Sequence, residues 1–196
     1  MPSFPKYNRQ LNQYCVVENY FSDEEIDKII DLEELQQFTE GRVGSNSESK
    51  LNKKTRDSEI SWLFPSNESS WVFNKFMALT AKVNYDHFML DIDGFESFQY
   101  TKYKNKQHYN WHYDTQLDYS TWERKISATV LLTDPEKYNG GEFEIVTNGN
   151  IEEPLSIKPS KGSIIFFASW MPHRVAPVKS GVRKSLVAWI MGKRPC

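Results

Sequence analysis

Two histidines and one aspartate are the residues whose types and spacing first indicate chemistry. His112 and Asp114 are separated by one residue, in a segment (107–114) whose composition predicts a β-strand. Because side chains alternate between the two faces of a strand, an imidazole and a carboxylate at this spacing project side by side. His173 follows an apolar run and a proline turn, and it can supply a third ligand to the same metal ion. Two imidazoles and one carboxylate on one face of iron(II) leave coordination positions open for oxygen and a co-substrate.

A second pairing of histidines gives a rival hypothesis. His108 and His112 have the spacing of a zinc pair on a helix, as in hydrolases that use a glutamate base. The residues between them lack a glutamate and have strand-like composition, which disfavours this alternative. His108 with Asn110 also repeats the spacing of His112 with Asp114, but an amide is a poorer iron ligand than a carboxylate.

Several motifs in a fixed order resemble one known family. Over roughly residues 96–192 the chain is similar to the prolyl 4-hydroxylase-like branch of the Fe(II)/2-oxoglutarate dioxygenases, which includes small bacterial and phage hydroxylases and PKHD-type hydroxylases. The family places a tyrosine, a glycine, a tyrosine and then His-x-Asp at three-residue steps, and Lys106 occupies the glycine position here. The other positions of the pattern are matched by Tyr103, Tyr109, His112 and Asp114.

Further along the chain the resemblance continues. The stretch 127–135 is similar to the family's central strand and turn, and Gly140-Gly141-Glu142-Phe143 is similar to the start of its next strand. The distal histidine of the family, with a basic residue after it, corresponds to His173 and Arg183.

The resemblance implies the ligand set and its co-substrate. His112, Asp114 and His173 would hold iron(II), and Arg183 would bind the distal carboxylate of 2-oxoglutarate. A guanidinium suits this role because its planar fork of donors can bind a carboxylate bidentately. Ser185 has the same strand parity as Arg183 and is expected to point the same way.

Three other side chains are expected to complete the pocket. Tyr103 is the candidate for a hydrogen bond to the co-substrate, and Trp189 shares the parity of Arg183. Some relatives carry a second tyrosine where Leu131 stands, so Thr129 is an alternative hydrogen-bonding residue.

The function implied by the resemblance is hydroxylation of an unactivated C–H bond, with oxygen consumed and with succinate and CO2 released. A prolyl residue of a peptide or protein is the leading substrate, and ascorbate is the expected reductant. Hydroxylation of a small molecule or another residue stays open, as does a non-catalytic metal-binding jelly roll. The residues expected to form a substrate groove are Trp111, Tyr113 and Trp189, with the further aromatics Tyr119 and Trp122 and the loop 41–54.

The elements that must position these residues follow from periodicity. An α+β, mainly β fold is predicted: a double-stranded β-helix, or jelly roll, over residues 86–194, with helical and loop support from residues 1–85 in one domain (1–196). One helix begins at Ser22 with a capping box to Glu25, and another begins near Ser69. The segment 56–63 reads as an edge strand. The predicted strands of the core are 95–104, 107–114, 126–133, 142–147, 154–158, 163–168, 173–178 and 183–191.

Composition excludes several classes of function. The chain has 24 basic and 26 acidic residues and a net charge of −2, and scattered basic residues disfavour nucleic acid as a partner. Its two cysteines, Cys15 and Cys196, give no disulfide framework. With no apolar leader and no run of about 18 apolar residues, a cytoplasmic protein without a membrane segment is expected, as a monomer or weak dimer. Phosphate-loop, nucleophile-elbow and dinucleotide patterns do not occur in the sequence.

Overall fold

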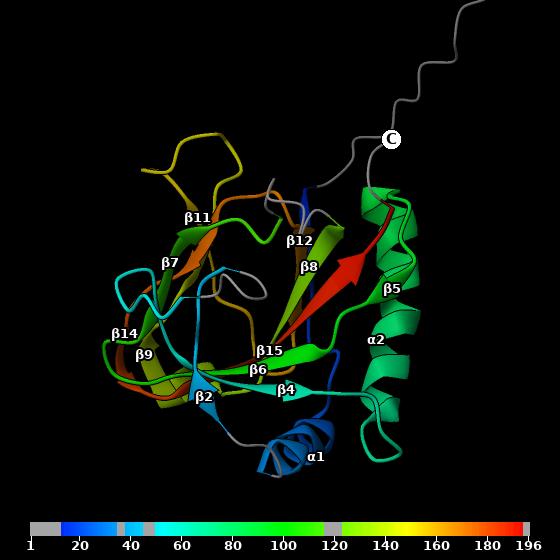
Figure 1. The fold of residues 1–196 in the computed structure, drawn as a ribbon, viewed down its shortest axis with the longest axis horizontal. Coiled ribbons are helices and arrows are strands. Elements are labelled where there is room, and N and C mark those ends of the chain that lie inside the picture. The colour runs from blue at the N-terminus through cyan, green and yellow to red at the C-terminus, as the bar shows by residue number, and fades with distance from the viewer. Residues whose placement is uncertain (1–12, 35–37, 45–49, 116–122, 194–196) are drawn as a thin grey trace, which may run out of the picture.

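The computed structural model describes residues 13–34, 38–44, 50–115 and 123–193. Most of the regular structure is antiparallel β-sheet, arranged as two sheets with helices against the larger one (Figure 1). This arrangement confirms the predicted jelly roll with helical support.

The larger sheet carries most of the hydrophobic core. Every pairing between its neighbouring strands is antiparallel. In sheet order its strands are β1 (Tyr14–Val17), β12 (Ile164–Ala168), β8 (Arg124–Leu131), β15 (Arg183–Met191), β6 (Phe98–Tyr103), β4 (Glu59–Leu63) and β2 (Thr39–Glu40), and β5 (Gly94–Phe95) pairs with β15.

A smaller sheet forms the opposite wall. Its strands, in order, are β11 (Leu155–Ile157), β10 (Phe143–Ile145), β13 (His173–Val175), β7 (His108–His112) and β3 (Arg56–Asp57). A separate two-stranded sheet contains β9 (Tyr138–Gly140) and β14 (Val178–Gly181). All eight predicted core strands are present, although most are shorter than expected.

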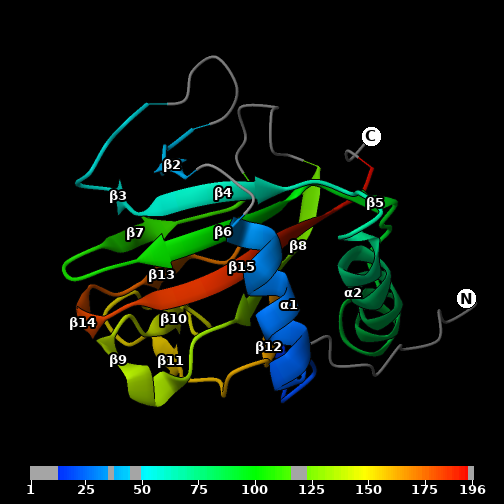
Figure 2. The same cartoon turned by 90° about the horizontal axis from the view of Figure 1, so that it is seen from below.

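Helices cover the outer face of the larger sheet (Figure 2). They are α1 (Asp23–Glu34), α2 (Ser70–Val83) and the π-helix η2 (Asn84–Phe88), whereas the short 3-10 helix η3 (Pro135–Lys137) contacts β9. The predicted capping box at α1 is confirmed, because the Ser22 amide donates to Glu25 Oε2 at 2.9 Å and the Glu25 amide donates to Ser22 Oγ at 3.3 Å. Among the described residues no helix is both long and apolar enough to cross a bilayer.

The two faces of β15 serve different purposes: one packs into the hydrophobic core, and the other lines a cavity between the two sheets. On β15 the apolar residues Leu186, Ala188 and Ile190 pack into the core beneath the helices. The alternate residues face the space between the two sheets, and they are Arg183, Ser185, Val187 and Trp189. Since side chains alternate on a strand, one strand therefore supplies both the packing of the helices and a wall of the cavity.

The turn between β6 and β7 explains the missing glycine of the family pattern. Lys106 has φ of 68°, in the left-handed region that glycine adopts most readily. Its amide donates to the Val178 carbonyl at 2.7 Å, which holds the turn in place. Lys106 therefore adopts a backbone conformation that favours glycine.

Two sequence-based expectations need correction. The segment 56–63 is not one edge strand but two strands: β3 lies at the edge of the smaller sheet, whereas β4 lies inside the larger sheet, with β6 on one side and β2 on the other. The strand predicted to extend through residue 114 ends at His112, and Asp114 lies beyond it.

Candidate functional site

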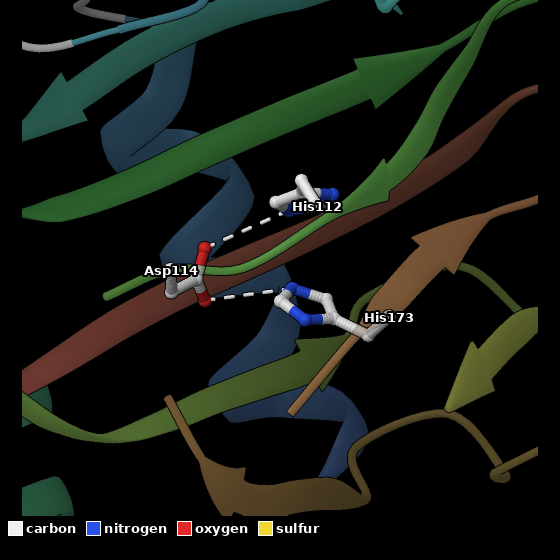
Figure 3. A group of neighbouring side chains, drawn as sticks. All are labelled: His112, Asp114 and His173. Atoms are coloured by element: carbon white, nitrogen blue, oxygen red, sulfur yellow. Dashed lines mark ion pairs between the residues drawn. The ribbon is translucent and has the colours of Figure 1, made fainter. Parts of the chain in front are cut away.

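Three side chains meet between the two sheets, where β7 ends and β13 begins (Figure 3). Nε2 of His112 lies 3.6 Å from Oδ1 of Asp114, and Nε2 of His173 lies 3.5 Å from Oδ2 of the same carboxylate. One ligand atom from each residue falls within 4.8 Å of the other two. Ligands about 2.1 Å from one ion lie roughly 3 to 4 Å apart, so both histidine–aspartate distances fit a single divalent metal.

Both imidazoles are oriented by their own backbone. Nδ1 of His112 lies 2.8 Å from the Asn110 carbonyl oxygen, and Nδ1 of His173 lies 2.9 Å from the Met171 carbonyl oxygen. A carbonyl can only accept, so each Nδ1 carries the proton and each Nε2 lone pair is available to a metal. The donor set therefore suits a metal ion in its chemistry as well as its spacing.

The pKa shifts of His112 and Asp114 favour the protonation states that bind a metal cation. Burial lowers the pKa of His112 from 6.5 to about 3, and the neighbouring His173 adds to the effect. Burial alone would raise the pKa of Asp114, but His173, His112, Arg124 and a hydrogen bond from Ser127 lower it to about 2. At neutral pH His112 is therefore a neutral ligand and Asp114 is an ionised one.

A pair of buried serines positions Asp114. Ser127 donates to Oδ2 of Asp114 at 2.7 Å, and the hydroxyls of Ser127 and Ser169 are 2.9 Å apart. Because Ser127 uses its proton on the carboxylate, Ser169 must be the donor in the second bond. The Ser169 carbonyl also accepts from the Asp114 amide at 3.0 Å. Sequence reasoning missed both serines, although Ser127 shares the parity of Thr129 on β8.

Arg183 lines the cavity that holds this triad. It is 2% exposed, its Nη1 donates to Ser185 Oγ at 3.0 Å, and its buried Nε has no hydrogen-bond partner. Such an unpartnered donor on a buried guanidinium fits an anionic ligand in the cavity. Most of the predicted pocket residues lie here together, and they are Tyr103, Thr129, Arg183, Ser185 and Trp189, with the metal triad.

Other predicted residues do not join this cavity. Trp111 packs instead against Arg174, whose guanidinium carbon is 4.7 Å from the ring centroid, and Tyr113 is 52% exposed. Neither residue is among those that line the cavity. Tyr119, Trp122 and part of the loop 41–54 lie outside the described residues.

The zinc-pair alternative is contradicted by the position of His108. Its Nδ1 and Nε2 lie 3.2 Å from the carbonyls of Lys106 and Lys54, and the segment is a strand. Among the described residues, the cluster that can hold a metal contains His112 and excludes His108.

Comparisons with known proteins agree with this geometry. Residues 98–191 match the family model described as the 2OG-Fe(II) oxygenase superfamily. The chain is 29% identical over 178 residues to a PKHD-type hydroxylase of Crocosphaera subtropica, covering 89% of this chain and 76% of that protein. Other PKHD-type hydroxylases align over less than half of their own length.

Two solved structures are similar over nearly the whole chain. A prolyl hydroxylase of Trichoplax adhaerens, in complex with a peptide fragment of the hypoxia inducible factor oxygen degradation domain, superposes with a TM-score of 0.76 at 18% identity, covering 92% of this chain and 84% of that one. A viral collagen prolyl hydroxylase from Paramecium bursaria Chlorella virus-1, in a 2OG complex, gives 0.67 at 26% identity, covering 93% and 97%.

Proposed function

The chain belongs to the 2OG-Fe(II) oxygenase superfamily, and from that premise we propose that it hydroxylates an unactivated C–H bond, with a prolyl residue of a peptide or protein as substrate. It is an enzyme of the 2-oxoglutarate-dependent dioxygenase type, and it uses iron(II), 2-oxoglutarate and oxygen. Ascorbate is the proposed reductant that keeps the iron in its divalent state.

The observation that carries the proposal is one cavity with two complementary features. His112, Asp114 and His173 form a three-ligand set, and Arg183 places an unpartnered guanidinium donor in the same cavity. When bound, iron(II), 2-oxoglutarate and oxygen together supply the oxidation, with release of succinate and CO2. The protein contributes ligands, orientation and the shape of the cavity.

Each residue has a defined part in this scheme. The Nε2 atoms of His112 and His173 would bind the metal together with the carboxylate of Asp114, whose Oδ2 also accepts a hydrogen bond from Ser127. Arg183 would bind the distal carboxylate of 2-oxoglutarate, and Ser185 fixes the guanidinium by accepting from Nη1. Tyr103 and Thr129 line the same wall and are proposed to contact the co-substrate.

The prolyl substrate is supported by the solved relatives. Two neighbours are prolyl hydroxylases, and one of them is in complex with a peptide fragment. A small-molecule substrate on the same scaffold is the second candidate, because the metal ligands are the same in both cases.

The proposal is tested by succinate release from purified protein supplied with iron(II), ascorbate, 2-oxoglutarate and candidate peptides. We expect succinate to form with the native chain and to be lost in Asp114→Ala, because that change removes an anionic ligand. Lys82→Gln is a suitable control, since Lys82 is an exposed residue of α2 that pairs with Asp86 and does not line the cavity. Equal succinate from the native chain and Asp114→Ala would exclude catalysis at this site and favour a metal-binding module without turnover.

A further inference from the structure

We propose that Arg56 binds a carboxylate of the substrate, so that the enzyme acts on molecules that carry a carboxylate near the oxidised carbon. This inference rests on the function proposed above and narrows its substrate class. Arg56 lies on β3, on the smaller sheet, and it lines the same cavity as the metal triad. Arg183 lies on β15 in the larger sheet, so the two arginines approach the cavity from different walls.

The Arg56 guanidinium is buried among neutral acceptors. Arg56 is 6% exposed. Its Nε donates to Ser58 Oγ at 3.0 Å, one Nη donates to Gln99 Oε1 at 2.5 Å, and the other reaches the Arg42 carbonyl at 3.4 Å. A guanidinium has five N–H donors, so these three contacts leave donors available to a ligand.

The two partly buried arginines of the described chain, Arg124 and Arg174, differ from Arg56 in their partners. Arg124 pairs with Glu96 at 2.7 Å and Arg174 pairs with Glu144, so both have carboxylate partners. Among the described residues Arg56 and Arg183 have none. A buried cation is strongly unfavourable unless an anion compensates it. The co-substrate compensates Arg183 in the proposed function, which leaves Arg56 to be compensated by a second anion.

The position of Arg56 places that anion close to the metal site. The Tyr109 ring stacks on His112 with centroids 3.5 Å apart, and the Arg56 guanidinium carbon lies 4.6 Å from the same ring centroid. One face of Tyr109 is filled by His112, so Arg56 lies over the opposite face. A group bound at Arg56 is therefore separated from a metal ligand by one aromatic ring.

Three kinds of molecule carry a carboxylate of the sort that Arg56 would bind. A free amino acid, a peptide with a carboxylate terminus next to the target residue, and a peptide with a neighbouring acidic side chain all offer a carboxylate. Converting the carboxylate to an amide keeps its shape but removes the charge that Arg56 would neutralise.

Matched acid and amide probes separate these sources. The first pair is L-proline with L-prolinamide, and the second is acetyl-alanyl-proline with its C-terminal amide. The third pair compares two C-terminally amidated peptides, acetyl-prolyl-glutamate, which has a free side-chain carboxylate, and acetyl-prolyl-glutamine. Each probe is titrated without oxygen into enzyme loaded with Mn(II) and N-oxalylglycine, and the dissociation constant is measured by calorimetry. Each pair is then tested for turnover with iron(II) and 2-oxoglutarate, by mass gain of one oxygen.

We expect the acid of at least one pair to bind about tenfold or more tightly than its amide, the usual scale for a charge-assisted hydrogen bond. Arg56→Gln should remove this preference, and Arg56→Lys should keep part of it because the charge remains. Lys104→Gln is the matched control: it removes a surface charge paired with Glu59, and it should leave the preference unchanged.

Two results would overturn the inference. One is that no acid binds more tightly than its amide in any pair, and the other is a preference that persists in Arg56→Gln. Failure of the proposed function looks different, because then neither N-oxalylglycine binding nor succinate release would depend on Arg183 and Asp114.

Discussion

Tyr109 lies face to face with His112, with ring centroids 3.5 Å apart and an angle of 11° between the planes. Residues three apart on a regular strand point to opposite faces, so this contact needs an irregularity. The pairing of β7 with β13 supplies it, because His112 pairs with His173 and Tyr109 with Val175, one extra residue lying between them on β7. The β-bulge turns both rings into the cavity.

Removing the stacked ring should weaken metal binding. Tyr109→Leu leaves His112 without its stacking partner, so we expect the affinity for Fe(II) or Co(II) to fall about tenfold, in the range found for supporting residues of metal ligands. Tyr109→Phe keeps the stacked ring and should bind metal as the native chain does. Anaerobic Co(II) titration followed by visible absorption measures both variants, and equal affinities for Leu and Phe would contradict the role of the stack.

The serine pair makes a second prediction about the carboxylate ligand. Ser127→Ala removes the donor to Asp114 Oδ2 and frees the carboxylate to rotate, so metal affinity at pH 7 should fall about tenfold. Ser127→Thr retains the hydroxyl and serves as the control. Ser169→Ala acts one hydrogen bond further away and should have a smaller effect in the same direction. If Ser169→Ala lowered metal affinity more than Ser127→Ala, the assignment of Ser127 as the direct donor to Asp114 would be wrong.

Loss of the Arg183 guanidinium should raise KM for 2-oxoglutarate. Arg183→Gln leaves the distal carboxylate without its charged partner, and we expect KM for 2-oxoglutarate to rise about 100-fold. Arg183→Lys keeps the charge but not the planar fork, so its KM should be intermediate. Succinate formation across a range of 2-oxoglutarate concentrations provides the measurement. An unchanged KM in Arg183→Gln would place the co-substrate elsewhere.

The metal-free protein should become less stable in mild acid. The folded-state pKa of His112 is about 3 and its ordinary value is 6.5, so between these limits the unfolded chain binds a proton that the folded chain does not. The free energy of unfolding should therefore fall by about 2 kcal/mol between pH 7 and pH 5 from this residue. Asp114, with a pKa lowered to about 2, loses its contribution only below about pH 4.

Urea unfolding of chelator-treated protein at both pH values provides the measurement. His112→Gln has no group to titrate, so its stability should change less over this interval. A variant with the same pH dependence as the native chain would mean that His112 is accessible to protons in the folded state.

The sequence predicted correctly those features that depend only on residues close together in one strand. The strand 183–191 was predicted with its parity, and Arg183, Ser185 and Trp189 do line the cavity together, because alternation holds along an uninterrupted strand. The prediction failed at β7, where the bulge between Tyr109 and His112 breaks the alternation and brings Tyr109 into the cavity beside His112, while Trp111 does not line it. The bulge depends on pairing with β13, which local composition does not encode.

The buried role of Arg56 was also beyond local patterns. Two of its three acceptors are Gln99 on β6 and the Arg42 carbonyl, which become neighbours only when the chain has folded. Tertiary pairing likewise explains β1, a four-residue strand, Tyr14–Val17, that is defined by its register with β12.

The two histidines of the triad hold their tautomers through carbonyls two residues earlier in their own segments. Many metal sites recruit such carbonyls or carboxylates from elsewhere in the fold. Here each ligand brings its orienting group along on the same short piece of backbone. Engineers who graft these two segments into another antiparallel scaffold would transfer the correct protonation pattern with them, and would need to rebuild only the support of the aspartate.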